Sequence, residues 1–283
     1  MIAPTSAMPG PVDEARRNEN FPVASRLIRP SLRPHVLAFY AFVRTADDIA
    51  DAPDLDPATK LARLGALERG LTGDGSGDDP LVAAVLRQSL AATGLGPEHA
   101  LHMLQAFRRD ASQATTRSWS DLLAYCRYSA APAGRYLLAL HGEGREALAA
   151  SDALCAALQI LNHLQDCGAD YRRLGRVYLP SDWLRQAGAS VDMLAAPSTA
   201  APLRAVLDRT LLGVAKLLAT AEPLPRLIGD RGLRREAAII YAIAKALARK
   251  LARRDPLRAR VRLTRLDVAW RAGLAYLKAG ISR

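Results

Sequence analysis

The sequence predicts an all-α protein. Its 283 residues are rich in Ala, Leu and Arg, which favour helix. Aromatic residues make up only 5% of the chain, and the alternating runs of Val, Ile and Thr that are typical of strands are scarce. Charged residues reach 24%, an ordinary value for a globular protein, so wholesale disorder is excluded.

Apolar periodicity and the breaks between periodic stretches predict the helices in order. Pro30 precedes the first long helix and Pro53 follows it, while glycines at 73–77 and prolines at 195–202 mark loops. No repeat or linker interrupts the pattern, so we expect a single domain over residues 1–283, with residues 1–18 flexible. The expected helices cover residues 32–52, 57–71, 79–93, 97–113, 118–141, 145–172, 201–222, 231–254 and 262–280.

Cysteine spacing and hydropathy exclude several classes of protein. Cys126, Cys155 and Cys167 show neither CxxC pairing nor metal-ligand spacing, so neither a disulfide framework nor a zinc site is expected. The N-terminal residues lack the apolar region of a signal peptide. No uninterrupted apolar run approaches the ~20 residues of a membrane-spanning helix. We therefore expect a cytoplasmic protein.

Charge is concentrated at the C-terminal end of the chain. Residues 230–283 carry fifteen Lys and Arg against four Asp and Glu, a net charge of +11 that equals the charge of the whole chain. A basic segment of this kind meets nucleic acid, anionic lipid or a phosphorylated ligand, or is simply a solvated helix face. With no helix-turn-helix and few aromatic residues between the cations, nucleic acid is the weaker alternative. Peripheral docking on an anionic membrane stays open.

A first acidic stripe lies in residues 39–51, FYAFVRTADDIAD. Tyr40, Arg44, Asp47 and Asp51 follow the spacing i, i+4, i+7, i+11 and share one face of the expected helix, with Asp48 beside them. Carboxylates this close repel one another unless a cation lies among them. Mg²⁺ binds in this way, through one or two carboxylates and substrate phosphate oxygens. The alternative is a solvated acidic face.

A second polar stripe lies in residues 158–180, LQILNHLQDCGADYRRLGRVYLP. Gln159, Asn162, Asp166 and Asp170 again share one helical face, next to a stripe of leucines. If the two stripes face each other, they would hold a diphosphate through bridging Mg²⁺ and assist its departure as a leaving group.

The paired DDIAD and QxxNxxxDxxxD segments, followed by GRVYLP, resemble the squalene/phytoene synthase family of head-to-head isoprenoid synthases. The likeness runs from about Glu19 to Arg265. It implies an all-α isoprenoid-synthase fold with a deep central cavity, Mg²⁺ at the cavity mouth and carbocation chemistry inside. It also implies catalytic roles for Asp47, Asp48, Asp51, Asp166 and Asp170, and a metal-ligand set of Asp47, Asp48, Asp51, Asn162, Asp166 and Asp170.

The same resemblance implies contacts to the diphosphate and its isoprenoid chain. Asn20 lies in NFPVASRL, where the family places polar diphosphate contacts, and Arg176 with Tyr178 matches an RxY site after the second motif. An Arg fork suits phosphate geometry. The full set of expected substrate-binding residues is Asn20, Tyr40, Arg44, Gln159, Arg176, Tyr178, Tyr241 and Arg260.

The segment YCRYSAAPAG, residues 125–134, resembles another family motif. Its small residues Ala130, Ala133 and Gly134 allow a prenyl chain or a neighbouring helix to approach closely. Pro132 stands where Thr is usual in the family and is expected to kink the helix, because proline removes a backbone hydrogen bond. His163, beside the second polar stripe, is expected to be a packed or surface histidine.

Glu19 before NFPVASRL, the segment RTADDIAD and the pair Gln165–Asp166 resemble the hopanoid-pathway hydroxysqualene synthases within this family. That likeness implies Mg²⁺-dependent conversion of presqualene diphosphate to hydroxysqualene, coupled to a presqualene diphosphate synthase and to a squalene-forming flavoprotein. Gln159, Asn162 or Gln165 would position the water. Other head-to-head synthases, which make presqualene diphosphate, squalene, dehydrosqualene or phytoene, remain open, as does a non-catalytic helical scaffold.

Overall fold

The computed structural model describes residues 25–74, 80–112 and 115–281. The expected flexible segment 1–18 and the expected substrate contact Asn20 lie outside these residues. The helices are α2 (Arg33–Asp51), α3 (Pro57–Thr72), α4 (Leu81–Thr93), α5 (Glu98–Ala111), α6 (Trp119–Ser129), α7 (Ala131–Leu140), η1 (Arg145–Ala147), α8 (Leu148–Leu174), α9 (Ser181–Gln186), η2 (Val191–Ala195), α10 (Ala201–Ala221), α11 (Leu224–Leu227), α12 (Arg231–Leu251) and α13 (Arg265–Ile281).

The all-α prediction is confirmed, and each long predicted helix is present with small shifts at its ends. The exception is the predicted helix over 118–141, which is two helices, α6 and α7, separated at Ala130 (φ −135°, ψ −47°). Pro132 therefore lies in the first turn of α7, where its missing N–H needs no acceptor. The sequence analysis did not predict the short elements η1, α9, η2 and α11, which are too brief for periodicity to reveal.

Side-chain caps and left-handed glycines set the helix ends. Asp56 accepts hydrogen bonds from the backbone N–H groups of Ala58 and Thr59 and so begins α3. Asp230 caps α12 through the N–H of Leu233. Gly175, at φ 65°, ends α8 in the left-handed conformation that glycine adopts without strain.

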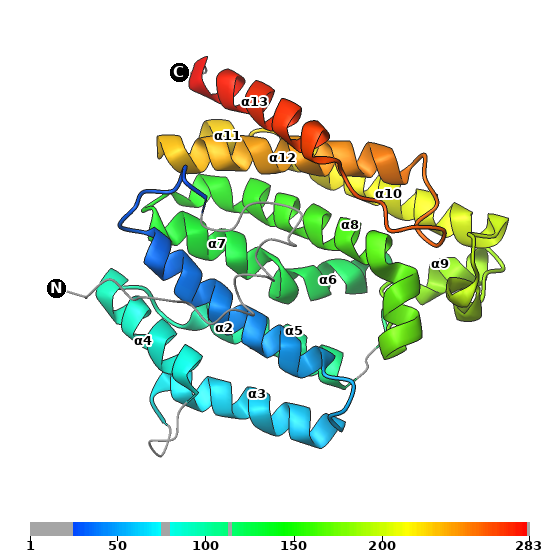
Figure 1. The fold of residues 1–283 in the computed structure, drawn as a ribbon, viewed down its shortest axis with the longest axis horizontal. Coiled ribbons are helices and arrows are strands. Elements are labelled where there is room, and N and C mark those ends of the chain that lie inside the picture. Colours follow the sequence, from blue (N-terminus) through cyan, green and yellow to red (C-terminus); the bar gives the residue numbers. More distant parts are fainter. Residues whose placement is uncertain (1–24, 75–79, 113–114, 282–283) are drawn as a thin grey trace.

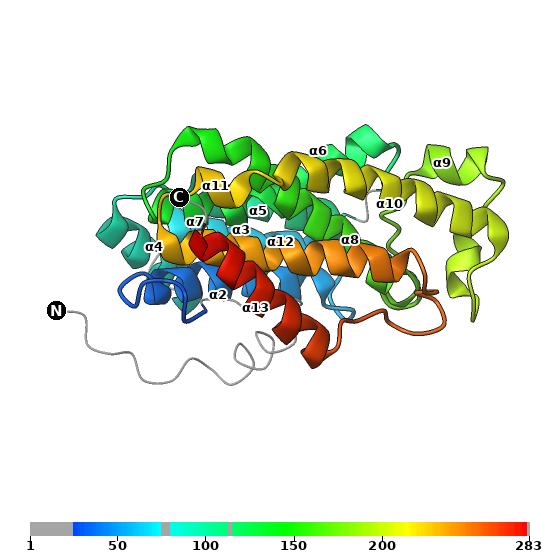
Figure 2. The ribbon, with the colours of Figure 1, turned by 90° about the horizontal axis from the view of Figure 1, so that it is seen from above.

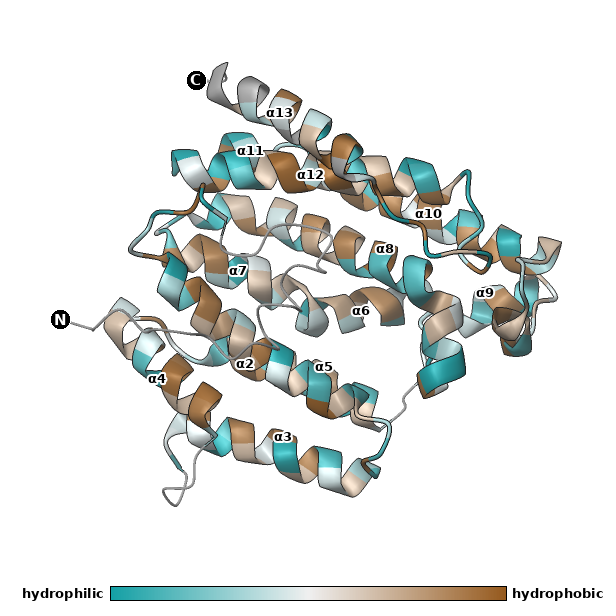
Figure 3. Ribbon diagram, in the orientation of Figure 1, coloured by the Kyte–Doolittle hydropathy of each residue, from teal (hydrophilic) through white to brown (hydrophobic). Residues whose placement is uncertain are grey.

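The described helices enclose two apolar cores (Figures 1 and 2). In the first, α2 packs on α3, α4 and α5, with Phe42 and Leu104 fully buried. In the second, α8 is central and packs on α6, α7, α10 and α12, and it contributes Leu161 and Leu164. Leu137 of α7 contacts both cores, so α7 lies between them. Figure 3 shows the corresponding alternation of apolar and polar residues along these helices.

Within the described part of the chain, the segment Arg145–Leu174 is long and apolar enough to cross a membrane by length and composition. The sequence analysis did not anticipate this. In the fold, 61% of the most apolar window is buried, because α8 forms the centre of the second core.

The segment that leads into α2 is fixed against the start of α12. Arg29 forms an ion pair with Asp230 (3.2 Å), and the hydroxyl of Ser25 donates to the buried carboxyl group of Glu236. Gly232 makes the closest approach, because a Cβ atom at that position would lie 2.1 Å from the carbonyl oxygen of Leu27. The absence of a side chain at this position lets the segment lie on the helix.

Replacing Gly232 by Ala is therefore expected to force the two backbones apart. The Gly232→Ala variant is predicted to lower the free energy of unfolding by about 1 to 3 kcal/mol, the usual cost of overpacking. Urea unfolding monitored by circular dichroism measures this. The matched control is Gly65→Ala in α3, whose Cβ would meet only the flexible Arg69 guanidinium at 3.4 Å. That change should stabilise the helix by about 0.5 to 1 kcal/mol, and equal effects of the two variants would contradict the account.

Candidate active site

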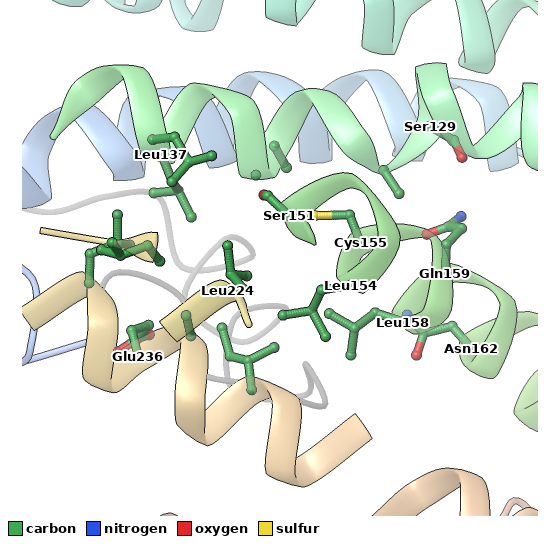
Figure 4. Close-up of a pocket in the computed structure, with 18 residues that line it drawn as sticks. Ser129, Leu137, Ser151, Leu154, Cys155, Leu158, Gln159, Asn162, Leu224 and Glu236 are labelled. Atoms are coloured by element: carbon green, nitrogen blue, oxygen red, sulfur yellow. The ribbon is translucent and has the colours of Figure 1, made fainter. Parts of the chain in front are cut away.

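A cavity of about 230 Å³ lies between α7, α8, α11 and α12 (Figure 4). Its wall is mainly apolar, with side chains such as Leu137, Leu154 and Leu158. Figure 4 shows Gln159 and Asn162 at one end of the lining and Glu236 at the other. The predicted deep central cavity is therefore present, with an apolar interior and polar groups at its two ends.

The small residues of the YCRYSAAPAG segment lie both at the cavity wall and at a close contact between helices. Ala130, Ala133 and Gly134 line the cavity. Gly134 also allows α7 to lie close to α8, because a Cβ atom there would lie 2.5 Å from the Ser151 hydroxyl and 2.7 Å from the Cys155 sulfur. Close helix packing and an open cavity wall depend on the same residues.

Beyond the polar end of the cavity, the carboxyl ends of three helices come together. Asp51 is the last residue of α2, Asp110 lies in the last turn of α5, and Asp166 and Asp170 lie in the last turns of α8. A helix carboxyl end already carries partial negative charge, so additional carboxylates there are unfavourable without cations. The structure supplies four arginines to this cluster: Arg44, Arg173, Arg176 and Arg260.

On α2, the predicted stripe is present. Arg44 donates to Asp47 at 3.1 Å and to Asp48 at 2.5 Å, and Tyr40 lies close enough to Arg44 to interact with its charge. Arg44 and Asp47 thus form an i,i+3 ion pair on α2. The Asp48 side chain is 58% exposed, so it lies toward solvent, whereas Asp47 interacts with Asp51 and Asp110 across the cluster.

Arg176 connects the three helix ends. Its guanidinium forms an ion pair with Asp51 and donates to the carbonyl oxygen of Ala50 at 2.8 Å and to that of Asp110 at 3.5 Å. Only 10% of its side chain is exposed. Arg173 adds a second, more exposed contact to Asp51 at 3.4 Å. Arg176 therefore neutralises one carboxylate and satisfies terminal carbonyls of α2 and α5.

Asp166 of α8 is held by Arg260 through two contacts of 2.6 Å, in which Nε and Nη2 of the guanidinium each donate to one carboxylate oxygen. Arg260 lies in the connection between α12 and α13, so the contact brings this distant segment to the cluster as predicted. Asp170 lies one turn further along α8. Gln159 and Asn162 precede Asp166 on the same helix and line the cavity, so α8 joins the apolar interior to the charged end.

The carboxyl groups of the cluster lie close enough to raise one another's pKa values. Burial and then the charge of Asp51 raise the pKa of Asp47 to about 7. Burial, followed by the charges of Asp166 and Asp51, raises the pKa of Asp170 to about 6. Burial also raises the pKa of Asp166, against the opposing effect of Arg260. Because the charge of Asp51 on α2 acts on Asp170 of α8, the ends of the two predicted acidic stripes lie near one another.

Asp110 and Tyr125 belong to the cluster and were missed by the sequence analysis. Asp110 accepts hydrogen bonds from Tyr125 (2.7 Å) and Tyr178 (3.2 Å), and burial raises its pKa to about 6. The ring of Tyr178 stacks on His163 at 3.6 Å, and burial lowers the pKa of His163 to about 3, so this histidine is a neutral packed residue as expected. The only sequence signal was the position of Tyr125 at the start of the YCRYSAAPAG segment.

Two expected residues lie away from the cluster. Tyr241 lies on α12 in a groove toward α13, where Lys245 approaches its ring at 5.3 Å, so the structure does not bring it to the carboxylates. Gln165 is buried and donates to the carbonyl oxygen of Val261 at 2.5 Å. It is absent from the cavity lining, whereas Gln159 and Asn162, the other two residues expected to position a water, belong to that lining.

The donor set fits a hard divalent cation. Among the described residues, no three Asp, Glu, His or Cys side chains lie close enough together to form a complete metal site. The carboxylates nevertheless come from neighbouring helices and raise one another's pKa. A cation bound among them would therefore stabilise their charged forms. Mg²⁺ takes few protein ligands and completes its octahedron with water and phosphate oxygens. The residues fit an ion that is held jointly with a diphosphate.

Comparison with known proteins agrees with this geometry. Residues 15–267 match the squalene/phytoene synthase family. A hydroxysqualene synthase of Rhodopseudomonas palustris is 48% identical over 254 residues, which are 90% of this chain and 86% of the relative. A hydroxysqualene synthase of Zymomonas mobilis is 41% identical over 268 residues, with 94% and 89% covered.

A solved structure shows the same likeness at the level of the fold. The crystal structure of a squalene synthase from Alicyclobacillus acidocaldarius superposes with a TM-score of 0.72 at 32% identity, covering 86% of this chain and 92% of that one. An all-α fold, an apolar cavity with acidic helices at its end and a match over most of the chain agree on one assignment. The chain belongs to the squalene/phytoene synthase family and is an isoprenoid synthase.

Proposed function

We propose that the protein converts presqualene diphosphate to hydroxysqualene and releases diphosphate, in bacterial squalene and hopanoid biosynthesis. The observation that carries this proposal is the junction of an apolar cavity with a carboxylate and arginine cluster on one helix, α8. That junction suits a substrate with a long hydrocarbon body and a diphosphate head. The identity of 48% and 41% to two hydroxysqualene synthases supports this product over the other products of the family.

We assign diphosphate binding to the charged end of the cavity. Asp47, Asp51, Asp166 and Asp170, with Asn162, would hold Mg²⁺, which when bound supplies charge neutralisation of the leaving diphosphate. The arginines of the cluster bind phosphate oxygens by forked hydrogen bonds. Their present ion pairs to Asp47, Asp51 and Asp166 keep both partners in place until substrate arrives. Tyr40 and Asp48 lie at the margin of this cluster.

The remaining steps use the cavity. Once the C–O bond to diphosphate breaks, the cyclopropylcarbinyl cation rearranges against a mainly apolar wall that limits the access of water. One water then forms the new C–O bond and loses a proton to the released diphosphate. Gln159 and Asn162 are the cavity-lining amides next to the carboxylate cluster, so we assign them the positioning of that water. Asp110 holds the hydroxyls of Tyr125 and Tyr178 and acts as a positioning residue for the cluster.

We further propose that the enzyme works in the cytoplasm, peripherally on an anionic membrane. A presqualene diphosphate synthase would supply its substrate, and a flavoprotein would reduce its product to squalene. Substrate and product are both long isoprenoids of low water solubility, so a position at the bilayer would shorten their transfer.

Product analysis tests the reaction directly. Purified protein with Mg²⁺ and presqualene diphosphate, without a nicotinamide cofactor, is predicted to release hydroxysqualene and diphosphate, and farnesyl diphosphate alone is predicted to give no product. Asp170→Asn should lower the rate of diphosphate release about 10²- to 10³-fold, as loss of one group that stabilises the leaving charge does. The control is Asp208→Asn, an exposed carboxylate paired with Arg204 on α10. Products from farnesyl diphosphate would refute the assigned substrate.

The raised pKa of Asp47 predicts a pH dependence of stability in the protein without divalent ions. Its folded-state pKa of about 7 lies above the ordinary value of 3.8, so the folded state binds more protons between pH 4 and pH 7. Stability from this group therefore falls as pH rises through that window. Asp47→Asn removes the effect, so its melting temperature should gain on the wild type from pH 4.5 to pH 8. Thermal unfolding in EDTA measures the gap, with Asp208→Asn as control, and a gap independent of pH would contradict the prediction.

A further inference from the structure

Helix α13 presents an apolar stripe to solvent. Leu266 is 82% exposed, Trp270 is 71% exposed and Leu274 is 44% exposed, and the spacing i, i+4, i+8 places them on one helix face. We call these three residues the α13 stripe. Large apolar side chains gathered on one exposed face indicate an interaction surface, whereas single exposed ones need no explanation.

The orientation of the α13 stripe follows from how α13 lies on α12. Asp267 near the start of α13 pairs with Lys250 near the end of α12 at 3.7 Å. Further along, the Arg235 guanidinium lies over the Tyr276 ring at 4.3 Å. The two helices therefore run antiparallel, and α13 is the outer layer of this side of the molecule (Figures 1 and 2). The α13 stripe lies on the outer face of that layer.

Cations line a groove beside the α13 stripe. The groove measures about 440 Å³ and lies between α12 and α13, and Leu274 belongs to both the groove and the stripe. One acidic residue, Glu222, also lines the groove, but among the described residues no ion pair joins an acidic side chain to its four cations, and the buried Nε of Arg271 lacks a hydrogen-bond partner. We call these four cations the basic groove: Arg226, Lys245, Arg249 and Arg271.

We propose that the α13 stripe and the basic groove together dock the enzyme on an anionic lipid bilayer. Apolar side chains on one helix face enter the boundary between headgroups and acyl chains, while neighbouring cations meet lipid phosphates. The combination of both chemistries within one helix pair fits this surface. The inference rests on the proposed membrane association and names the part of the chain responsible for it. It does not involve the residues assigned to catalysis.

Charge argues against the two other occupants of this face. Residues 230–283 have a net charge of +11, so a symmetric dimer through α13 would bring two strongly positive surfaces together. Nucleic acid phosphates would pair with the cations. Leu266 and Trp270 would stay exposed to solvent, however, because contacts to a duplex backbone are polar. An anionic bilayer accommodates both the apolar and the basic residues.

Vesicle co-sedimentation of the full chain tests the proposal. Vesicles of phosphatidylcholine with phosphatidylglycerol are compared with vesicles of phosphatidylcholine alone, at low and at physiological salt. The wild type should bind the anionic vesicles and bind the neutral ones much more weakly. Leu266→Ser with Trp270→Ser should weaken partition at least about ten-fold, because the buried apolar area is lost. Lys245→Gln with Arg249→Gln should weaken it roughly 10- to 30-fold at low salt.

The matched control is Leu81→Ser with Leu212→Ser, which removes two equally apolar side chains that are 76% and 67% exposed on α4 and α10. This control should partition as the wild type does. Diphosphate release in detergent, without vesicles, should be unchanged in the stripe variant, which separates membrane docking from the proposed reaction.

Four results would overturn the proposal. The first is failure of the wild type to bind anionic vesicles at low salt. The second is equal partition of the stripe variant and the control. The third is a change of sedimentation coefficient from dimer to monomer in the stripe variant. The fourth is binding of duplex DNA that exceeds vesicle binding and is unchanged in the stripe variant.

Discussion

The structure depends on the convergence of three helix carboxyl ends at one point. Helices α2, α5 and α8 each bring acidic side chains to their last turns, where the helix dipole is already negative. Arg176 makes this arrangement stable. Its guanidinium forms an ion pair with Asp51 and donates hydrogen bonds to terminal carbonyl oxygens of both α2 and α5. The arginine and carboxylate cluster joins α2 and α5 of one apolar core to α8 of the other, and its carboxylates raise one another's pKa.

Segregation of polar and apolar groups along α8 explains how the fold serves its chemistry. The middle of the helix lines the cavity with Leu154 and Leu158, and its end carries Asp166 and Asp170. This segregation of apolar and charged groups would orient the proposed substrate, which has a hydrocarbon body and a diphosphate head. In the proposed reaction, the leaving group departs toward the charged end, while the carbocation stays beside the mainly apolar wall of the cavity.

The long helices and the two acidic stripes could be predicted from the sequence, because both depend on the 3.6-residue period of a single helix. Pro132 indicated a kink in the helix predicted over 118–141, and the structure has two helices there, α6 and α7. Asp110 could not be found in this way, since only tertiary packing brings the end of α5 to α2 and α8. The same limit applies to Arg260, which was identified by resemblance and whose contact with Asp166 spans 94 positions of the chain.

Tyr241 and Gln165 show why a correct helix does not fix the role of its residues. Both lie on helices that were predicted, α12 and α8, and both neighbour residues of the cavity wall. A shift of one residue along a helix turns the side chain by about 100°, so Tyr241 faces the groove beside α13 while Ile240 faces the cavity. Gln165 similarly faces the backbone of Val261, whereas Asp166 faces Arg260.

Calorimetric titration of diphosphate into the protein tests the central claim, that facing carboxylates and arginines form a joint site for a cation and a diphosphate. With Mg²⁺ present, diphosphate should bind at least about ten-fold more tightly than in EDTA, and by linkage diphosphate should strengthen Mg²⁺ binding by the same factor. Equal affinity for diphosphate with and without Mg²⁺ would contradict the account, because the carboxylates would then take no part in holding the leaving group.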